Sequence, residues 1–187
     1  MAGTPCDDPK QSATDPPRPA GLAPDGPHQC GDVDIRIGRD GRWFYHGSPI
    51  GRKPLVKLFA SVLRRDEAGD YWLQTPVEKA RIRVDDAPFV AVALAVEGDG
   101  REQRLVFRSN LDDVVCADAD HPIRIAHDAR TGEPAPYVTV RPGLEALIAR
   151  SVFYQLVDLA DQCPESHILG VWSAGIWFPL GSAGEAT

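Results

Sequence analysis

The sequence predicts an α+β fold in which two small, β-rich domains are built from a duplicated strand–helix–strand unit. An aromatic strand runs directly into an amphipathic helix over residues 43–65, and a diverged copy of this arrangement occurs over residues 137–159. Between and after the two copies, apolar and polar side chains alternate or short apolar runs occur, which is typical of strands. Together these observations indicate two related units connected and followed by further strands.

The composition limits the cellular setting and the partners. Of the 187 residues, 43% are hydrophobic and the net charge is −7, so we expect a packed core and no binding of nucleic-acid polymers by bulk electrostatics. No apolar run approaches the ~20 residues that a membrane helix needs. The N-terminus has no hydrophobic signal segment. We therefore predict a cytoplasmic protein with no membrane partner.

Motifs for metal binding and catalysis are absent from the sequence. The four cysteines are too widely spaced for a zinc site, and we expect reduced thiols. The acidic segment of residues 112–120 lacks the glycine and the terminal glutamate of a calcium loop. There is no nucleophile elbow, phosphate-binding loop or dinucleotide-binding glycine triplet. We predict no metal, no cofactor and no catalytic residue, and an enzyme is not favoured.

The chain divides into two domains and two tails. The first 31 residues contain seven prolines and almost no large apolar side chains, which predicts disorder because little surface can be buried. A break at Thr75-Pro76 marks the boundary between the domains. The predicted segments are a disordered tail over 1–31, an N-terminal α+β domain over 32–78, a C-terminal β-rich domain over 79–181, and a polar tail over 182–187.

The N-terminal domain begins with a predicted hairpin. Val33, Ile35 and Ile37 alternate with polar residues, as in a strand with one buried face. Asp40-Gly41 supplies the positive φ of a tight turn, and residues 43–45 form the returning strand. This places an aromatic strand directly before the first helix.

The first helix begins near Pro54, where a missing N–H costs nothing. Its predicted apolar face has helical spacing and consists of Leu55, Leu58, Phe59, Val62 and Leu63. Gly69 ends the unit, and residues 71–73 form a short aromatic strand.

The C-terminal domain is mostly β. Residues 89–96 are almost continuously apolar, which predicts a strand buried on both faces, and residues 98–100 form a hairpin turn. Leu105 and Phe107 lie on one face of the returning strand. Other strands are expected over 79–84, 114–115, 123–126, 137–140, 169–172 and 176–180.

A second helix is predicted from Pro142 to a stop at Pro164. Its apolar stripe consists of Leu144, Leu147, Ile148, Val152, Leu156 and Leu159. The two helices align at one constant offset, pairing Arg52, Leu55, Leu58, Phe59 and Leu63 with Arg141, Leu144, Leu147, Ile148 and Val152. Two amphipathic helices can match by chance, but each unit also has an aromatic strand before it and a tryptophan-containing strand after it, which favours a duplication.

The main functional signal is electrostatic. Residues 41–65 contain six basic residues and no acidic one, so this stretch carries +6 and the rest of the chain carries −13. At ~100° per residue, Lys53, Lys57 and Arg64 fall on one side of the predicted helix. Such a face suits an anionic ligand such as a phosphate, although most amphipathic helices have an ordinary solvated face.

The candidate ligand-binding residues combine this face with the domain boundary. Glu78 and Lys79 lie beside the predicted boundary, where ligand pockets often form. Tryptophans can stack on a ring, although packing in the core is the alternative for each of them. The candidates are Lys57, Arg64, Arg65, Lys79, Glu78 and Trp172.

Several motifs together resemble an uncharacterised proteobacterial family, catalogued only as a domain of unknown function. The motifs are Asp34-Ile35-Arg36-Ile37, Asp40-Gly41-x-Trp43-x-Tyr45-x-Gly47-Ser48-Pro49-Ile50, Leu55-Val56-Lys57-Leu58-Phe59, Tyr71-Trp72-Leu73-x-Thr75-Pro76-Val77-Glu78-Lys79, Asp86-Ala87-Pro88-Phe89-Val90 and Leu169-Gly170-Val171-Trp172-Ser173. The resemblance covers about residues 32–181. It implies a duplicated α+β core, a second domain similar to pleckstrin-homology folds with a helix in its C-terminal half, a site for a nucleotide-like molecule at the domain interface, and a role in signalling.

Two functional hypotheses follow from the basic stretch and the resemblance. The first is a non-enzymatic binding protein that holds a small anionic, nucleotide-like ligand between the two units. The second is a protein–protein interaction module, because pleckstrin-like barrels often bind protein partners.

Overall fold

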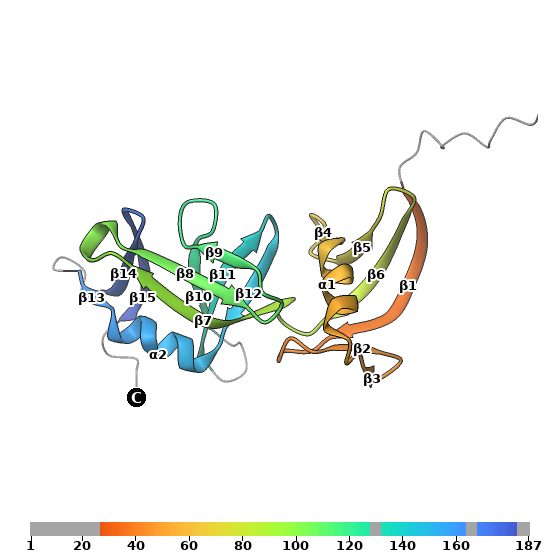
Figure 1. Cartoon of the computed structure of the whole chain (residues 1–187), viewed down its shortest axis with the longest axis horizontal. Helices are drawn as coiled ribbons and strands as arrows, with labels where there is room; N and C mark the ends of the chain where they lie inside the picture. Colours follow the sequence, from red (N-terminus) through yellow and green to blue (C-terminus); the bar gives the residue numbers. More distant parts are fainter. Residues whose placement is uncertain (1–26, 128–131, 164–167, 183–187) are drawn as a thin grey trace, which may run out of the picture.

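The computed structural model describes residues 27–127, 132–163 and 168–182. In this part of the chain, two β-rich domains lie side by side and contain two α-helices (Figure 1). The predicted class of two small β-rich domains with few helices is thereby confirmed. None of the helices in the described ranges is long and apolar enough to cross a membrane. The predicted tails fall largely outside the described residues, at 1–26 and 183–187.

The first domain is a six-stranded sheet with one helix. Its elements are β1 (His28–Ile37), β2 (Trp43–Tyr45), β3 (Ser48–Pro49), α1 (Lys53–Ser61), β4 (Leu63–Arg65), β5 (Tyr71–Gln74) and β6 (Glu78–Val84). The strand order is β3-β2-β1-β6-β5-β4, and the central pair β1 and β6 is parallel. The first sheet therefore begins before the expected Asp32 and extends past the expected boundary after residue 78.

The second domain contains a six-stranded sheet, a helix and a three-stranded sheet. Its elements are β7 (Phe89–Glu97), η1 (Gly100–Glu102), β8 (Arg104–Ser109), β9 (Val114–Cys116), β10 (Ile123–His127), β11 (Pro134–Arg141), β12 (Leu144–Ile148), α2 (Arg150–Asp158), β13 (Asp161–Gln162), β14 (Ile168–Ser173) and β15 (Ile176–Ser182). The larger sheet has the order β10-β11-β12-β7-β8-β9, with β7 and β12 parallel. Helix α2 packs against β7 and β14.

The two domains repeat a sheet topology rather than the predicted strand–helix–strand unit. In each large sheet, two three-stranded meanders meet through parallel pairing of the first and the last strand. The helix positions differ, because α1 lies between the two meanders of its domain and α2 follows both. The residue alignment proposed from the sequence is therefore wrong, since it pairs α1 with strand β12.

The second helix begins later than predicted. Residues 144–148 form β12, in which Leu144, Ala146 and Ile148 are buried and the residues between them are half-buried. This alternation has the period of a strand. The predicted helix instead placed Leu147 in the same apolar stripe as Leu144 and Ile148. Helix α2 starts at Arg150, and its buried residues are Val152 and Leu156.

The first helix is shorter than predicted and rotated. It ends at Ser61, so Leu63 belongs to a strand. Its buried residues are Val56 and Ala60, whereas the side chain of Leu58, predicted to face the core, is 62% exposed. Val56 and Ala60 are spaced i, i+4, so they lie on one face of the helix, and both belong to the buried core cluster.

Most predicted strands are confirmed, including the buried faces of β1 and β8. Strand β7 differs, because only its beginning, with Phe89 and Ala91, is fully buried. Val92 and Val96 are 44% and 42% exposed. The parallel partner β12 pairs with residues 89–91 alone, and the rest of β7 is paired on one side only, with β8.

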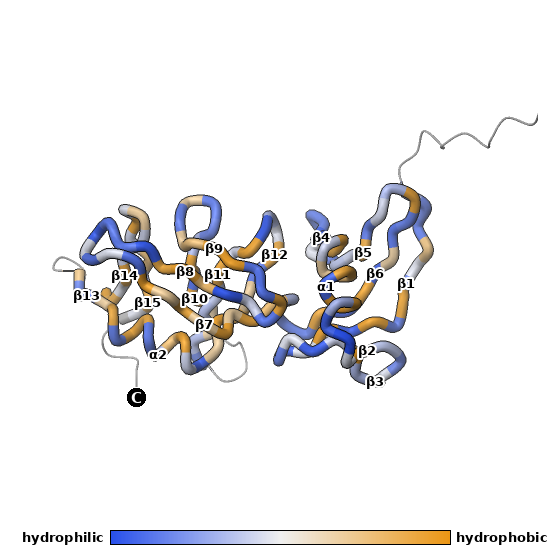
Figure 2. The backbone as a smooth tube through the Cα atoms, viewed as in Figure 1, coloured by the Kyte–Doolittle hydropathy of each residue, from blue (hydrophilic) through white to orange (hydrophobic). Residues whose placement is uncertain are grey.

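One continuous cluster of buried side chains includes residues from both domains. Trp43 and Val56 of the first domain and Phe89 and Leu111 of the second belong to it. Figure 2 shows hydrophobic residues along β7 and hydrophilic ones in the turns between strands, whereas charged and apolar residues alternate in β6. The two domains are thus joined by apolar contact as well as by the short segment between β6 and β7.

Candidate functional site: the interdomain junction

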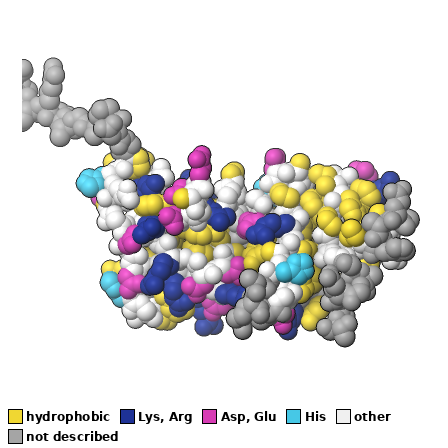
Figure 3. Space-filling model, turned by 180° about the vertical axis from the view of Figure 1, so that it is seen from behind, with side chains coloured by type: hydrophobic (Ala, Val, Ile, Leu, Met, Phe, Trp, Pro, Cys, Tyr) yellow, Lys and Arg dark blue, Asp and Glu magenta, His cyan; other side chains and the backbone are white. Residues whose placement is uncertain are grey.

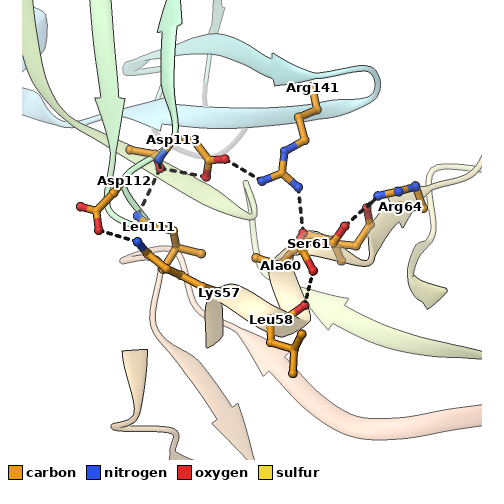
Figure 4. A network of polar contacts seen from close by, with 11 residues as sticks. Lys57, Leu58, Ala60, Ser61, Arg64, Leu111, Asp112, Asp113 and Arg141 are labelled. Carbon is orange, nitrogen blue, oxygen red and sulfur yellow. Dashed lines mark hydrogen bonds and ion pairs between the residues drawn. The ribbon is translucent and has the colours of Figure 1, made fainter. Parts of the chain in front are cut away.

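The turn between β8 and β9 (residues 109–113) carries most of the polar contacts across the domain junction. The hydroxyl oxygen of Ser109 accepts hydrogen bonds of 3.1 Å from the backbone N–H groups of both Leu111 and Asp113. Asp112 adopts a positive φ of 68°, which non-glycine residues rarely do. These local bonds shape the turn so that the side chain of Asp112 faces Lys57 of helix α1 and that of Asp113 faces Arg141 (Figure 4).

Asp112 binds two lysines of helix α1. Its Oδ2 lies 2.9 Å from Nζ of Lys53 and 2.8 Å from Nζ of Lys57. The lysines are one helical turn apart and therefore reach the same carboxylate. The hydrogen bonds from Lys57 and Lys53 lower the pKa of Asp112 to about 2.

Asp113 and Asn110 extend the contact in both directions. Asp113 pairs with Arg141 at 2.6 Å, and Arg141 also donates a 2.9 Å hydrogen bond to the carbonyl of Ala60 in the last turn of α1 (Figure 4). Asn110 donates a 3.1 Å bond from Nδ2 to the carbonyl of Gly41. One five-residue turn therefore connects to the helix and to the β1–β2 hairpin of the other domain.

The segment between the domains is held by its own polar contacts. The hydroxyl of Tyr137 donates a 2.6 Å hydrogen bond to Asp86, which also pairs with Arg39 at 3.0 Å. Burial, together with the hydrogen bond to Asp86, raises the pKa of Tyr137 to about 12. The connection is thus attached to the hairpin of the first domain and to β11 of the second.

A pocket of about 310 Å³ lies at this junction. Its lining comes from the β1–β2 hairpin, the approach to α1, and the β8–β9 turn: Gly41, Arg42, Trp43, Pro49, Ile50, Gly51, Lys53, Val56 and Leu111. Arg42 and Lys53 are its charged residues. Trp43 is 2% exposed and stacks on Phe59, and its indole nitrogen is buried without a hydrogen-bond acceptor among the residues the structure describes.

The basic residues nominated from the sequence do not converge on one site. Lys57 lies at the junction, but Arg64 and Arg65 are in β4, where neighbouring side chains point to opposite faces. Arg64 donates to the carbonyls of Leu63 and Ser61, at 2.6 and 3.3 Å. Arg65 lies over the ring of Tyr71, with 5.3 Å between its guanidinium carbon and the ring centroid.

The other nominated residues lie on the outer side of the first sheet or in the second domain. The Nζ atom of Lys79 is 3.9 Å from the ring centroid of Trp72, and Trp72 donates to Asp66 at 2.7 Å. Glu78 is exposed and begins β6, whereas Trp172 lies in β14, at the end of the second domain away from the junction. Figure 3 shows basic and acidic side chains interspersed over the back of the molecule.

Sequence reasoning missed the central residue of this junction. Asp112 was considered only as a calcium ligand and rejected, while its two partners were assigned to an open basic face. A signal was present, because a pair of adjacent aspartates is a natural complement to a stretch with no acidic residue. Nothing local indicates which of the 27 acidic residues of the chain supplies that complement.

Comparisons with known proteins identify relatives over residues 25–180. The family model of the N-terminal domain of DUF1285, a domain of unknown function, matches residues 25–87, and that of the DUF1285 C-terminal domain, also of unknown function, matches residues 88–180. The matches meet between β6 and β7, where the structure separates the two large sheets. No curated protein matches the chain.

Two solved structures are similar. A DUF1285 family protein from Silicibacter pomeroyi DSS-3 shares 51% sequence identity with a TM-score of 0.80, covering 89% of this chain and 91% of that one. A DUF1285 family protein from Shewanella baltica OS155 shares 24% identity with a TM-score of 0.52, covering 66% of this chain and 90% of that one, which is a likeness of fold alone.

Proposed function

This chain belongs to the DUF1285 family of proteins of unknown function, and we propose that it is a non-enzymatic protein that binds a small anionic, nucleotide-like molecule between its two domains. The observation that carries the proposal is the interdomain pocket. Its wall combines apolar and aromatic side chains with two cations, Arg42 and Lys53. A ring would pack against the apolar wall, and an anionic group would meet the cations.

The dimensions and the polar groups of the pocket support a ligand of this class. Its volume of about 310 Å³ lies at the lower end of the roughly 300–1,000 Å³ range of small-molecule sites. A buried donor without an acceptor costs about 1–3 kcal/mol, so an acceptor on the ligand that reaches the indole N–H of Trp43 would recover that cost. Arg42 is well exposed and able to turn toward a ligand.

The residues that we assign to the ligand differ from most of those nominated from the sequence. Arg42 and Lys53 take the place of Arg64, Arg65 and Lys79, which do not line the pocket. Lys57 retains an indirect role, because it shares the carboxylate of Asp112 with Lys53.

A signalling role is part of the same proposal. The pocket is lined by both domains, so its occupancy would bias how they are held together, which a partner could detect. The proposed likeness of the second domain to pleckstrin-homology folds is supported by a helix that follows the strands of the large sheet. A protein-interaction module is the second candidate, and the exposed Tyr154 and Val157 on the outer side of α2 favour it.

A thermal-shift screen with mono- and dinucleotides tests the ligand proposal. A ligand at about 100 times its Kd should raise the Tm of a protein of this size by roughly 5–10 °C. Arg42→Ala should reduce the shift, and Arg83→Ala is a matched control. Both arginines have side chains 76% exposed and pair with a nearby aspartate, at 3.3 and 3.4 Å, but Arg83 does not line the pocket.

Two outcomes would contradict the proposal. One is that no nucleotide changes the Tm, and the other is that Arg42→Ala and Arg83→Ala reduce a shift equally. A stoichiometric protein partner captured from native lysate and lost in Tyr154→Ser, without any nucleotide shift, would favour the interaction module instead.

A further inference from the structure

A second, larger pocket lies at the opposite end of the C-terminal domain from the junction. Its volume is about 700 Å³, and it is lined by η1, β13 and the β14–β15 hairpin through Gly100, Arg101, Asp161, Gln162, Cys163, Trp172 and Trp177. In Figure 1, β13, β14 and β15 lie at the end of the molecule away from α1. This pocket is therefore separate from the proposed interdomain site and does not depend on it.

Two tryptophans form an aromatic corner in this pocket. Trp172 and Trp177 are directly opposite each other in β14 and β15, with ring centroids 5.2 Å apart and ring planes inclined by 59°. Trp177 lies directly on the backbone of Gly170, where a Cβ atom would be only 2.5 Å from its ring. Both tryptophans are half-buried, so each is supported by the fold and still presents surface to the pocket.

The walls of the pocket are held in place by hydrogen bonds between η1 and the hairpin. The backbone N–H of Gly175 donates to the carbonyl of Arg101 at 3.1 Å. Gln103 accepts from the N–H of Ala174 at 2.7 Å through its carbonyl, and its side-chain amide donates to the carbonyl of Trp172 at 2.9 Å. The site is therefore preformed, which lowers the entropic cost of binding a ligand.

The charged groups of the lining balance each other. The guanidinium carbon of Arg101 lies 4.9 Å from the ring centroid of Trp172, and the carboxylate of Asp161 belongs to the exposed strand β13. One cation and one anion give no net attraction for a charged ligand. Both groups are planar. The guanidinium can donate two parallel hydrogen bonds and the carboxylate can accept two, which suits neighbouring hydroxyl groups.

We propose that this pocket binds a neutral saccharide. A sugar ring presents C–H groups on one face, which pack against an indole, and hydroxyl groups around its edge. In the proposed complex the C–H face lies on Trp177, and hydroxyl groups bond to Arg101 and Asp161. A purely aromatic ligand would leave these polar groups without partners, and for an anionic ligand the attraction to Arg101 would be offset by repulsion from Asp161.

Nitrogen–proton NMR correlation spectra of the full chain test the proposal, because the four tryptophans supply four indole resonances. The probes are cellobiose, maltose and diacetylchitobiose, with adenosine and inorganic phosphate as competing ligand classes. At least one disaccharide is expected to shift the Trp172 and Trp177 resonances saturably. Trp72 is an internal control, because it also carries a cation on its ring, from Lys79 at 3.9 Å, but lies in the other domain.

Two arginine variants separate recognition from folding. Arg101→Ala, at an exposed position, should weaken saccharide binding by about tenfold or more, the loss expected for a charge-assisted hydrogen bond. Arg104→Ala, also exposed and outside the pocket, should leave binding unchanged. The proposal is overturned if none of the three disaccharides moves the two resonances, if adenosine or phosphate moves them instead, or if both variants behave alike.

Discussion

At the scale of single residues, close approach between the domains depends on a glycine. Gly41 has φ +76°, and a Cβ atom there would lie 2.6 Å from Nδ2 of Asn110 and 3.0 Å from Cγ2 of Val90. Gly41 thus serves the hairpin turn and also leaves room for the β8–β9 turn of the other domain. Gly47 has nearly the same φ of +75°, but nothing lies within 4 Å of the corresponding position.

This pair of glycines predicts two different costs for the same substitution. Gly47→Ala should lower the free energy of unfolding by about 1–2 kcal/mol, the cost of a left-handed conformation. Gly41→Ala should lower it by roughly 2–5 kcal/mol, because overpacking against Asn110 and Val90 is added. Urea unfolding of both variants measures the difference. Equal losses of stability in the two variants would show that Asn110 and Val90 can move away from residue 41 without an energetic cost.

At the scale of elements, helix α1 shows how packing chooses the buried face. The sequence contains apolar residues on most sides of this segment, and its short length leaves the rotation undetermined. Packing in the folded protein buries Val56 and Ala60, while Leu58 is 62% exposed. Strand β12 shows the same ambiguity, since its apolar residues fit a helix and a strand almost equally well.

Truncation of the two helix residues tests the observed rotation. Val56→Ala should lower the free energy of unfolding by roughly 1–3 kcal/mol, because buried methyl groups are removed from the core. Leu58→Ala should change it by no more than about 0.5 kcal/mol, as for most surface positions. Chemical denaturation compares the two variants directly. A larger loss of stability from Leu58→Ala than from Val56→Ala would mean that the helix buries the face predicted from the sequence.

At the scale of the whole molecule, the two domains are coupled through one turn. Asn110 and Asp112 bind groups of the first domain directly. Asp113 pairs with Arg141, which in turn donates a hydrogen bond to helix α1. The carboxyl groups of Asp32 and Asp66 also have lowered pKa values, through hydrogen bonds from Arg81 and Trp72 respectively, but these partners lie in the same domain. Among these three aspartates, Asp112 is the one whose protonation acts on the junction.

The lowered pKa of Asp112 predicts a pH dependence of stability. A carboxyl group with a pKa of about 2 in the folded protein and about 4 in the unfolded chain stabilises the fold above pH ~4, and this stabilisation is lost as the pH falls toward 2. The free energy of unfolding should therefore be higher for the wild type than for Asp112→Asn above about pH 4, and this difference should disappear as the pH falls to about 2. Urea unfolding at a series of pH values measures this difference.

A double-mutant comparison assigns the effect to the two lysines. In the Asp112→Asn background, Lys53→Gln with Lys57→Gln should cause little further loss, because the contact has already been weakened. If the lysine substitutions destabilise both backgrounds equally, the ion pairs do not account for the pH dependence. Added salt should reduce the difference in free energy of unfolding between the wild type and Asp112→Asn at neutral pH, since the two lysines and Asp112 are exposed to solvent.

Much of the architecture could be predicted because its signals are local. The alternation of Val33, Ile35 and Ile37 and the turn at Asp40-Gly41 predicted the first hairpin, and the structure confirms it. The family resemblance was confirmed in the same way, from motifs that depend only on order along the chain. The predicted ligand site could not be located similarly, because Arg64, Lys79 and Trp172 are brought to different surfaces by the paths of their strands.

The sequence by itself determined most of the strands and turns of this protein, its two-domain class and its family, since these depend on the periodicity and order of neighbouring residues. Only the tertiary structure decided that residues 144–148 form a strand, that Val56 rather than Leu58 is buried, and that Lys53 and Lys57 meet Asp112. The physical reason is that such choices depend on contacts between residues distant in the chain, where several partners of similar chemistry compete and packing selects one.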